Sequence, residues 1–470
     1  MDKIEMKVSG PLERITHLPD SMQYNVLLRS TFSLVPSKEE IPRPLAFVQP
    51  TSVADVQLVT QWAQKEKLPL CVRVGGHDSL RRSTLGGTVV IDLTALKEIE
   101  ILLDEQSEAT GDGLKPAGIA KIGGGTLTVD LLAALKAQGC MVPTAAAESV
   151  GHAGWAMLGG YSCMSGVLGM GVDQIVGATL VTANGDVVTV SESKNSDLLW
   201  GVRGGGGNFG IVVELEIKIY KIDKFLAGGL VFDSQDLSST ITNFLTAYSH
   251  LQSSPEMPPG FYGLVGVVNI PKLGKGLVFT YVWLSEDRTG ETAWRQRMKS
   301  LGGVKCIVDA VTEVNASQMV ANMSKVAPYG VYGLFKSVNV SGDALRNEDF
   351  LKITVQNLVQ MPSLPGCALT IQQYRPPVTS NVESQAVWSP RDPHHMLLLI
   401  GTSPDDQHPR LQESIDWVDN FEASLRDIVL AKAYSPFSFK TDLGSGEEKF
   451  RSLQEKWDPE GMWSNAIPGI

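Results

Sequence analysis

A histidine just after two glycines is the part of this sequence best suited to chemistry. The segment RVGGHDS, residues 73–79, follows the apolar run LPLCVRV, which predicts a buried strand. Two glycines after a strand can form a tight turn whose N–H groups point into one concavity, as a bound diphosphate requires. Arg73 suits such an anion. His77 could then be a base, a ligand or a covalent attachment point, or it could only cap backbone groups.

Glycine is concentrated in the same part of the chain, because residues 75–210 contain 26 of the 46 glycines. The segment GGGNFG, residues 205–210, matches the G-x-G-x-x-G spacing of dinucleotide-binding loops. That fingerprint needs a strand before it and a helix after it, whereas here a predicted helix precedes and a predicted strand follows. A nicotinamide Rossmann domain is therefore not expected. The glycines indicate instead that a ligand or another backbone comes close to the main chain.

Other catalytic and metal-binding patterns are missing from the sequence. It has no G-x-S-x-G, G-x-x-x-x-G-K-[ST], H-E-x-x-H or C-x-x-C motif. His394 and His395 are adjacent, so they cannot share one helix face as metal ligands spaced i, i+4 do. The seven histidines form no ligand cluster by spacing. No metal site is predicted, and the hydrolase and metalloenzyme classes are disfavoured.

The composition bounds the partners and the location. With 43% hydrophobic residues, 19% charged residues and a net charge of −11, the chain reads as a globular protein that binds neither nucleic acid nor an anionic membrane. No apolar run is long enough to span a membrane, and no secretory signal is recognised, so a cytoplasmic location is expected. Five scattered cysteines suit reduced thiols. Three Asn-x-Ser sequons, at Asn315, Asn322 and Asn339, leave a secreted protein open if a signal peptide was removed.

The elements that must position these residues can be followed along the chain. In the first half the pattern predicts a helix that begins after Thr51 or Ser52, strands at 68–74, 88–93, 117–123 and 209–220, helices at 128–140 and 195–204, and a hairpin over 176–192 that turns at Asn184-Gly185. These elements form one α+β unit that ends near residue 222. In the second half we expect strands near 261–270, 277–284, 367–373 and 395–401, and helices near 236–250, 286–300, 343–360, 409–427 and 446–457. That order suggests a sheet with helices on one face.

Residues 73–79, 149–186 and 195–217 together resemble a known family in order, spacing and content. They are similar to the FAD-linked oxidases of the berberine bridge enzyme-like group, in the vanillyl-alcohol oxidase and p-cresol methylhydroxylase superfamily, with fungal members the most similar. The tail, residues 450–469, resembles the closing segment of the family. The resemblance implies an α+β, two-domain FAD-binding fold of the p-cresol methylhydroxylase type. It would comprise an FAD-binding domain at 1–222, a substrate-binding domain of antiparallel sheet covered by helices at 223–430, and a return to the FAD-binding domain at 431–470.

The resemblance also implies where FAD would bind. Its pyrophosphate would lie on Arg73, Val74, Gly75, Gly76, His77, Asp78 and Ser79, and His77 would be joined covalently to the flavin 8α-methyl group. Members with a second covalent link use a cysteine where this chain has Ala147, so a single link is expected. The other FAD-binding positions would be Val150, Gly151, Trp155, Gly159, Gly160, Tyr161, Asp173, Gly210, Val212 and Asn465. Val150 falls where the family controls oxygen access, and Trp155 replaces a histidine of many plant members.

The resemblance implies an FAD-dependent oxidase that takes a hydride from an alcohol, an amine or an activated C–H group of a small organic substrate and forms H2O2 from O2, with fungal secondary metabolism as one setting. The cofactor supplies the redox step, while the protein supplies position and a base. Candidate bases are Tyr374, His395 and Tyr434, and Tyr434 is preferred because family members have a flavin-facing tyrosine in the corresponding strand. A redox-neutral cyclisation with structural FAD and a dehydrogenase with another acceptor remain open. The substrate and the oligomeric state are not predicted.

Overall fold

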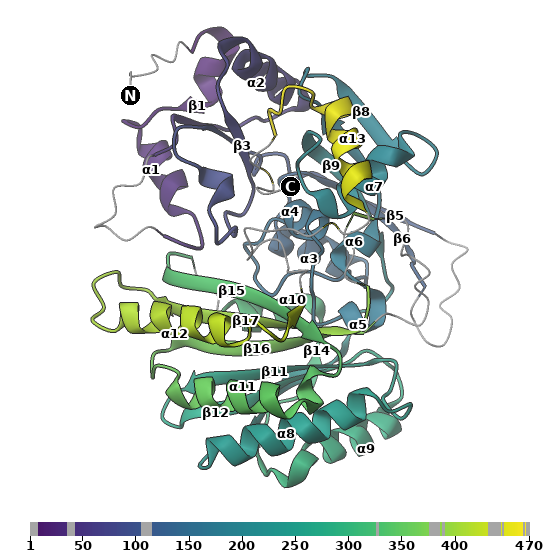
Figure 1. The fold of residues 1–470 in the computed structure, drawn as a ribbon. Helices are drawn as coiled ribbons and strands as arrows, with labels where there is room; N and C mark the ends of the chain where they lie inside the picture. The colour runs from purple at the N-terminus through teal and green to yellow at the C-terminus, as the bar shows by residue number, and fades with distance from the viewer. Residues whose placement is uncertain are drawn as a thin grey trace.

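The structure is a computed structural model that describes residues 8–34, 43–104, 115–325, 329–375, 386–387, 391–430, 443, 446–463 and 466. These residues form three sheets with helices packed around them, and the predicted α+β class is confirmed (Figure 1). Two smaller sheets belong to the first half of the chain. The third and largest is built after residue 222 and lies across from them.

The first sheet carries the turn with His77. Its strand order is β1 (Thr16–His17), β2 (Ala46–Val48), β4 (Val89–Asp92), β3 (Leu70–Arg73), and the last three strands are parallel. Helix α2 (Val53–Glu66) connects β2 to β3, and the Ser52 side chain accepts a hydrogen bond from the Asp55 N–H, which confirms the predicted cap. Because β3 and β4 are parallel and in register, Arg73 and Asp92 end side by side, and the loop with His77 starts at that edge.

The second sheet is antiparallel, with the order β5 (Ile99–Leu103), β6 (Gly118–Gly123), β9 (Ile211–Ile219), β7 (Ile175–Val181), β8 (Val187–Ser191). The hairpin of β7 and β8 turns at Asn184-Gly185 as predicted, and Gly185 has a φ of +80° there. The helices and 3₁₀ turns of the first half, besides α2, are η1 (Gly10–Ile15), α1 (Met22–Arg29), η2 (Arg82–Thr84), α3 (Thr128–Ala137), α4 (His152–Met157), α5 (Ser165–Leu168), α6 (Gly171–Gln174) and α7 (Ser196–Gly205). Helix α13 (Glu447–Trp457) returns to this half and packs on α7.

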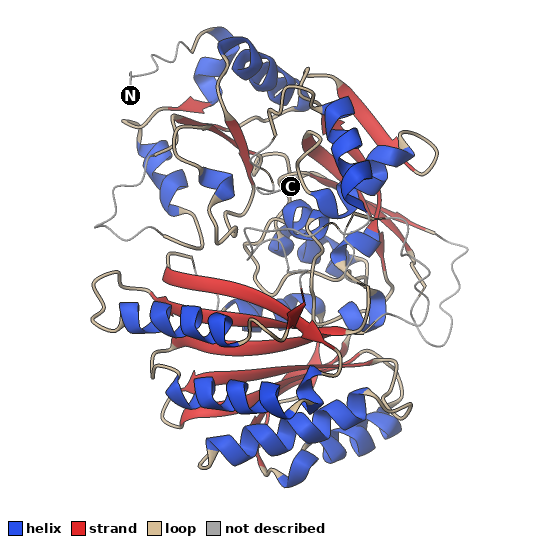
Figure 2. Cartoon of the chain, viewed as in Figure 1, coloured by secondary structure: helices blue, strands red, loops and turns tan. Residues whose placement is uncertain are grey.

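The third sheet runs in the order β13 (Cys306–Asp309), β10 (Phe225–Phe232), β12 (Gly274–Trp283), β11 (Phe261–Ile270), β16 (Gly366–Tyr374), β17 (His394–Ser403), β15 (Tyr332–Ser341), β18 (Val429–Leu430), with β14 (Thr312–Val314) also on β10. Helices α8 (Leu237–Gln252), α9 (Arg288–Met298), α11 (Glu348–Gln360) and α12 (Leu411–Ser424) cover one face (Figure 2). This confirms the predicted sheet with helices on one side. The remaining elements of this half are η3 (Leu301–Gly303), α10 (Ala316–Ser324) and η4 (Ala344–Arg346).

The large sheet is buried on both faces. Side chains such as Phe279 and Trp283 pack under the helices, whereas Leu264 and Val282 pack against residues of the first half that include Leu168. Successive side chains of a strand point to opposite faces, so each strand contributes to both layers. The face toward the first half therefore meets the glycine-rich segment 151–171.

Candidate active site

The loop after β3 packs closely against a second loop, residues 147–151. A Cβ atom added at Gly75 would collide with the carbonyl oxygen of Ser149. One added at Gly151 would lie 2.6 Å from the Cβ of Val74, and Gly76 has a φ of +63°. Only glycine permits these close approaches and this backbone conformation. The structure thus brings together two segments, 73–79 and 150–151, that were both predicted to bind FAD.

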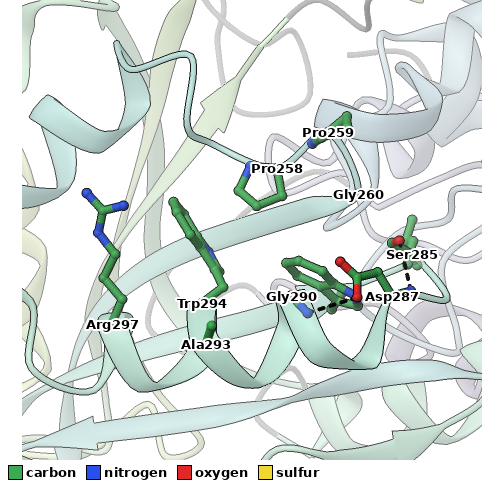
Figure 3. A pocket seen from close by; sticks show the side chains of 11 residues that line it. Pro258, Pro259, Gly260, Ser285, Asp287, Gly290, Ala293, Trp294 and Arg297 are labelled. Atoms are coloured by element: carbon green, nitrogen blue, oxygen red, sulfur yellow. Dashed lines mark hydrogen bonds between the residues drawn. The ribbon is translucent and has the colours of Figure 1, made fainter.

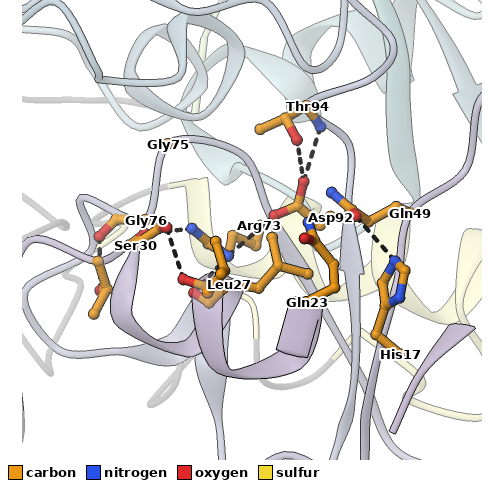
Figure 4. Close-up of polar contacts among 12 residues, drawn as sticks. His17, Gln23, Leu27, Ser30, Gln49, Arg73, Gly75, Gly76, Asp92 and Thr94 are labelled. Carbon is orange, nitrogen blue, oxygen red and sulfur yellow. Dashed lines mark hydrogen bonds and ion pairs between the residues drawn. The ribbon is translucent and has the colours of Figure 1, made fainter. Parts of the chain in front are cut away.

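Arg73 supports the loop from within the protein (Figure 4). Its guanidinium forms a buried ion pair with Asp92 at 3.1 Å and donates to the carbonyl oxygens of Leu27, at 3.0 Å, and Ser30. These groups close the end of α1 over the loop. Two guanidinium nitrogens are therefore engaged by internal partners, whereas the buried Nε, beside Gly76, has no partner among the described residues. A direct role of the Arg73 side chain toward FAD stays a prediction.

His77 is held between two aromatic rings. Its ring centroid lies 5.0 Å from that of Phe32, with the planes 24° apart, and 5.1 Å from that of Tyr329. Its Nε2 is 2.7 Å from the Ser149 hydroxyl oxygen, while Nδ1 has no hydrogen-bond partner in the described part of the chain. Burial lowers the pKa of His77 to about 4, so the imidazole is neutral at pH 7. A neutral, fixed imidazole with one nitrogen engaged and the other available is suited to nucleophilic attachment.

Cys140 and Cys163, the cysteines on either side of Ala147 in the sequence, are packed into the core. Ala147 is buried, and a second covalent link at this position stays excluded only by the predicted correspondence. The Sγ of Cys163 lies 4.0 Å from the Sδ of Met323, and burial raises its pKa to about 12, so it is a thiol and not a thiolate. Cys140 lies in the core of the second sheet.

The glycine-rich segment is folded around Trp155. A Cβ at Gly171 would lie 2.8 Å from the indole ring and one at Gly160 3.2 Å from it, and the indole Nε1 donates to the carbonyl oxygen of Tyr161 at 3.3 Å. Gly159 and Gly160 have φ values of +115° and +76°. Trp155 therefore fixes the path of the segment, and contact with FAD stays a prediction.

Four other predicted positions make contacts elsewhere within residues 1–222. The Val150 carbonyl accepts hydrogen bonds from the N–H and hydroxyl of Thr128, at the start of α3. Gly210 has a φ of +146° beside the carbonyl of Val181, and Val212 is buried in β9. Asp78 accepts hydrogen bonds from the backbone and the guanidinium of Arg82 and so shapes the end of the first loop.

A polar cluster joins the glycine-rich segment to the large sheet. The Tyr161 hydroxyl is hydrogen-bonded to His394 Nε2, and His394 Nδ1 lies 2.7 Å from the carbonyl oxygen of Asp392. Close by, Asp173 and Arg391 form a buried ion pair at 2.7 Å. Burial lowers the pKa of His394 to about 4. Asp173 thus ties α6 to the segment that leads into β17, and a contact with FAD stays a prediction.

The candidate bases lie in different surroundings. Tyr374 packs on His394 with 5.0 Å between ring centroids, so it joins this cluster. His395 faces the helix-covered side of the sheet, where its Nε2 lies 3.0 Å from the amide oxygen of Gln252 in α8. Adjacent residues of a strand face opposite sides of the sheet, so His394, and not His395, faces the glycine-rich segment. Tyr434 and Asn465 lie outside the described residues.

A separate cavity of about 410 Å³ opens on the helix-covered side of the large sheet (Figure 3). It is lined by Pro258, Pro259, Gly260, Trp283, Leu284, Ser285, Asp287, Gly290, Ala293, Trp294 and Arg297. None of the predicted site residues lines it. Elsewhere in the described residues, no His, Cys, Asp and Glu side chains gather in a group of three that could hold a metal ion, and no helix is long and apolar enough to cross a membrane.

The chain is similar in sequence to a known domain family and to known oxidoreductases. Residues 44–191 match the FAD binding domain family. The FAD-linked oxidoreductase aurO of Gibberella zeae is 29% identical over 90% of this chain and 79% of its own length. The (R)-6-hydroxynicotine oxidase of Paenarthrobacter nicotinovorans is 33% identical, over 45% of this chain and 44% of its own length.

Solved structures show the same fold over nearly the whole chain. The 6-hydroxy-D-nicotine oxidase of Arthrobacter nicotinovorans has a TM-score of 0.82 at 22% identity, covering 99% of this chain and 100% of that one. The berberine bridge enzyme-like protein 1 of Physcomitrella patens has a TM-score of 0.77 at 18% identity, with 96% of each chain covered. Glucooligosaccharide oxidase of Acremonium strictum, described with a 6-S-cysteinyl, 8α-N1-histidyl FAD, has a TM-score of 0.77 at 19% identity, again with 96% of each chain covered.

Residues 44–191 match an FAD binding domain and the chain is similar to FAD-linked oxidoreductases, and the predicted FAD-binding fold is confirmed. It is an oxidoreductase that uses FAD, as the sequence predicts. Four neighbours of the candidate site were not predicted from the sequence, namely Ser149, Phe32, Tyr329 and His394. The doublet at 394–395 signalled a histidine near the site, whereas no local pattern marks the other three.

Proposed function

We propose that this protein is an FAD-dependent oxidase with FAD attached through a single covalent bond to His77. The observation that carries the proposal is the environment of His77: a neutral imidazole, held between Phe32 and Tyr329, at the contact of the two glycine loops. If Nε2–H donates to Ser149, the lone pair is on Nδ1, which is then the attacking nitrogen. The absence of cysteine from residues 145–154 supports a single link.

The residues present fit the cofactor. His152, next to Gly151 in the second loop, is fully buried, and both of its ring nitrogens lack a partner in the described residues. The same holds for the hydroxyl of Thr126, whose carbonyl accepts the His152 N–H at 3.0 Å. Buried polar groups normally have a partner, so these atoms indicate that a polar ligand or water completes the region.

The chain and the cofactor would supply different parts of the oxidation chemistry. FAD, when bound, supplies hydride acceptance and the passage of electrons to O2. The loop at residues 73–79 would bind the pyrophosphate through its N–H groups, and His77 would fix the cofactor in place. The apolar cluster of Tyr161, Met170, Val172, Tyr374 and Met396 would exclude water where the substrate-binding sheet meets the glycine-rich segment.

We propose that residues 1–222 and 431–470 form the FAD-binding domain and that residues 223–430 bind a small organic substrate, an alcohol, an amine or an activated C–H compound. The change from the second to the third sheet between β9 and β10 supports the first boundary. The nicotine oxidase relative supports a small substrate.

A screen of alcohols and amines that follows O2 uptake and H2O2 tests the activity. We expect a substrate that bleaches the flavin without oxygen and yields H2O2 in air. Bleaching without O2 uptake would instead identify a dehydrogenase with another acceptor. Product formed without bleaching would identify a redox-neutral cyclase.

A further inference from the structure

Tyr329 comes from the half of the chain that contains the large sheet, but its side chain reaches both glycine loops of the candidate site. It lies three residues before β15 begins. The phenol hydroxyl donates to the carbonyl oxygen of Gly75 at 2.6 Å and lies 3.3 Å from the carbonyl oxygen of Ser149. One hydroxyl group therefore holds the loop at residues 73–79 together with the loop at residues 147–151.

The ring of Tyr329 also covers His77. Its centroid lies 5.1 Å from that of the imidazole, with 36° between the two planes. Phe32 stacks on the same imidazole and in turn packs on Phe335 of β15, with 4.7 Å between the two phenyl centroids. Aromatic rings from both halves of the chain therefore limit the rotation of the His77 ring.

Backbone hydrogen bonds close a frame around His77. The Phe32 N–H donates to the carbonyl oxygen of Gly76, the residue before His77, at 2.9 Å. The carbonyl oxygen of Phe32 accepts a hydrogen bond from the Val331 N–H, one residue before β15, at 3.0 Å. The loop is therefore connected to the start of β15 twice, once through Phe32 and once through the Tyr329 hydroxyl.

The second loop is held from the same half of the chain. The hydroxyl of Ser324, the last residue of α10, accepts a hydrogen bond from the Glu148 N–H at 2.7 Å. The partners in these side-chain hydrogen bonds are 176 to 254 positions apart in the sequence. Such contacts form only when the two halves pack together, so the loops reach this arrangement after the large sheet has docked.

We propose that Tyr329 is a positioning residue for the attachment of FAD to His77, which rests on the covalent link proposed above. Attachment joins a ring nitrogen to the 8α carbon of the flavin. The methyl group and the imidazole N–H each lose a proton, while the electron pair of the C–H bond reduces the flavin, which O2 then reoxidises. Tyr329 takes no part in these bonds. It fixes the loops and the plane of the imidazole, and so limits the orientations that the nucleophile can adopt.

Tyr332 provides a matched control for this assignment. It is a half-buried tyrosine at the start of β15, and its hydroxyl has no hydrogen-bond partner among the described residues. Phenylalanine at either position removes one hydroxyl group and keeps the ring. A loss shared by Tyr329→Phe and Tyr332→Phe would reflect only the stability of this segment.

The first test is ¹H NMR of the histidine rings in the apoprotein, with the His77 signals assigned by their loss in His77→Ala. We expect Tyr329→Leu to shift the His77 ring signals, because the ring current of the neighbouring phenol is lost, and Tyr332→Leu to leave them in place. His77 signals that Tyr329→Leu leaves unchanged would overturn the proposal. This measurement needs neither FAD nor a substrate.

The second test is the rate at which acid-stable flavin forms after saturating FAD is added to the apoprotein, because saturation separates positioning from affinity. Tyr329→Phe should slow attachment about 2- to 10-fold, the factor that one ordinary hydrogen bond supplies, and Tyr329→Leu should slow it further. Tyr332→Phe should match the wild type. Equal rates in the wild type and Tyr329→Phe, or equal losses in the two phenylalanine variants, would refute this proposal alone. A wild type that never acquires acid-stable flavin would refute the covalent link itself, and this proposal with it.

Discussion

At the scale of single residues, Ser149 holds His77 through a hydrogen bond to Nε2 of the imidazole. The hydroxyl lies 2.7 Å from Nε2, so an Nε2–H tautomer leaves the Nδ1 lone pair available for bond formation. The two flanking rings restrict rotation of the imidazole. Attachment therefore needs both the neutral ring and its orientation.

Ser149→Ala should slow covalent attachment of FAD without changing the fold. Without the hydroxyl the imidazole loses this hydrogen bond, so the ring is held less firmly in the orientation that attachment needs. The measurement is the fraction of acid-stable flavin over time after FAD is added to apoprotein. Ser193→Ala, an exposed loop serine, is the control. Equal time courses for wild type and Ser149→Ala would show that this hydrogen bond does not direct attachment.

At the scale of elements, the contact between the two loops is the critical feature. Gly75 and Gly151 allow the two backbones to touch. A Cβ atom added at Gly154 in α4 would instead meet open space. Glycine is therefore required at Gly75 and Gly151, whereas Gly154 can be replaced.

Gly75→Ala should abolish FAD incorporation, because the new methyl group must push the Ser149 carbonyl, and with it the partner of His77, out of position. Gly154→Ala should bind FAD normally and raise the free energy of unfolding by up to about 1 kcal/mol, since alanine favours a helix. Flavin content and urea denaturation check both variants. Normal flavin content in Gly75→Ala would contradict the proposed role of the loop contact.

Local signals were sufficient for part of this architecture. The cap at Ser52, the Asn184-Gly185 turn and the apolar run before Arg73 act over a few residues, so the sequence predicts α2, the hairpin and β3. Strands β10 and β15 were missed because β10 contains Gly228-Gly229 and the burial of both depends on partners far along the chain. For the same reason, no local pattern could decide that His394 and not His395 faces the glycine-rich segment.

At the scale of the whole molecule, a buried ion pair joins the two halves and four histidines are buried in the neutral form. The ion pair of Asp173 and Arg391 connects α6 to the large sheet. Burial also lowers the pKa of four histidines, to about 4 for His77, His394 and His395 and to about 3 for His152. Both features make the stability of the folded protein sensitive to charge.

Asp173→Asn should lower the free energy of unfolding by about 3 to 5 kcal/mol, because it leaves the Arg391 guanidinium buried without its counter-charge. Asp197→Asn, which breaks the exposed pair with Lys456, should cost at most about 1 kcal/mol. Urea denaturation of the holoenzyme compares them. Similar losses in the two variants would mean that the buried pair has no special role.

Stability should fall as the pH drops from about 7 to 5.5. The unfolded chain takes up protons on these histidines near their ordinary pKa of 6.5, whereas the folded protein does so only near 4 or below. The unfolded state then binds more protons, so the free energy of unfolding decreases with falling pH. Urea midpoints at several pH values measure this trend, and His395→Gln should reduce its slope. A midpoint that rises on acidification would contradict the burial of neutral histidines.

The covalent bond at His77 is the central claim, and acid precipitation of the purified protein followed by intact-mass measurement tests it most directly. We predict a yellow precipitate, a mass higher by one FAD, and loss of both in His77→Ala, with Cys163→Ala unchanged. Yellow colour that stays in the supernatant, or a His77→Ala protein that keeps FAD through denaturation, would contradict the account.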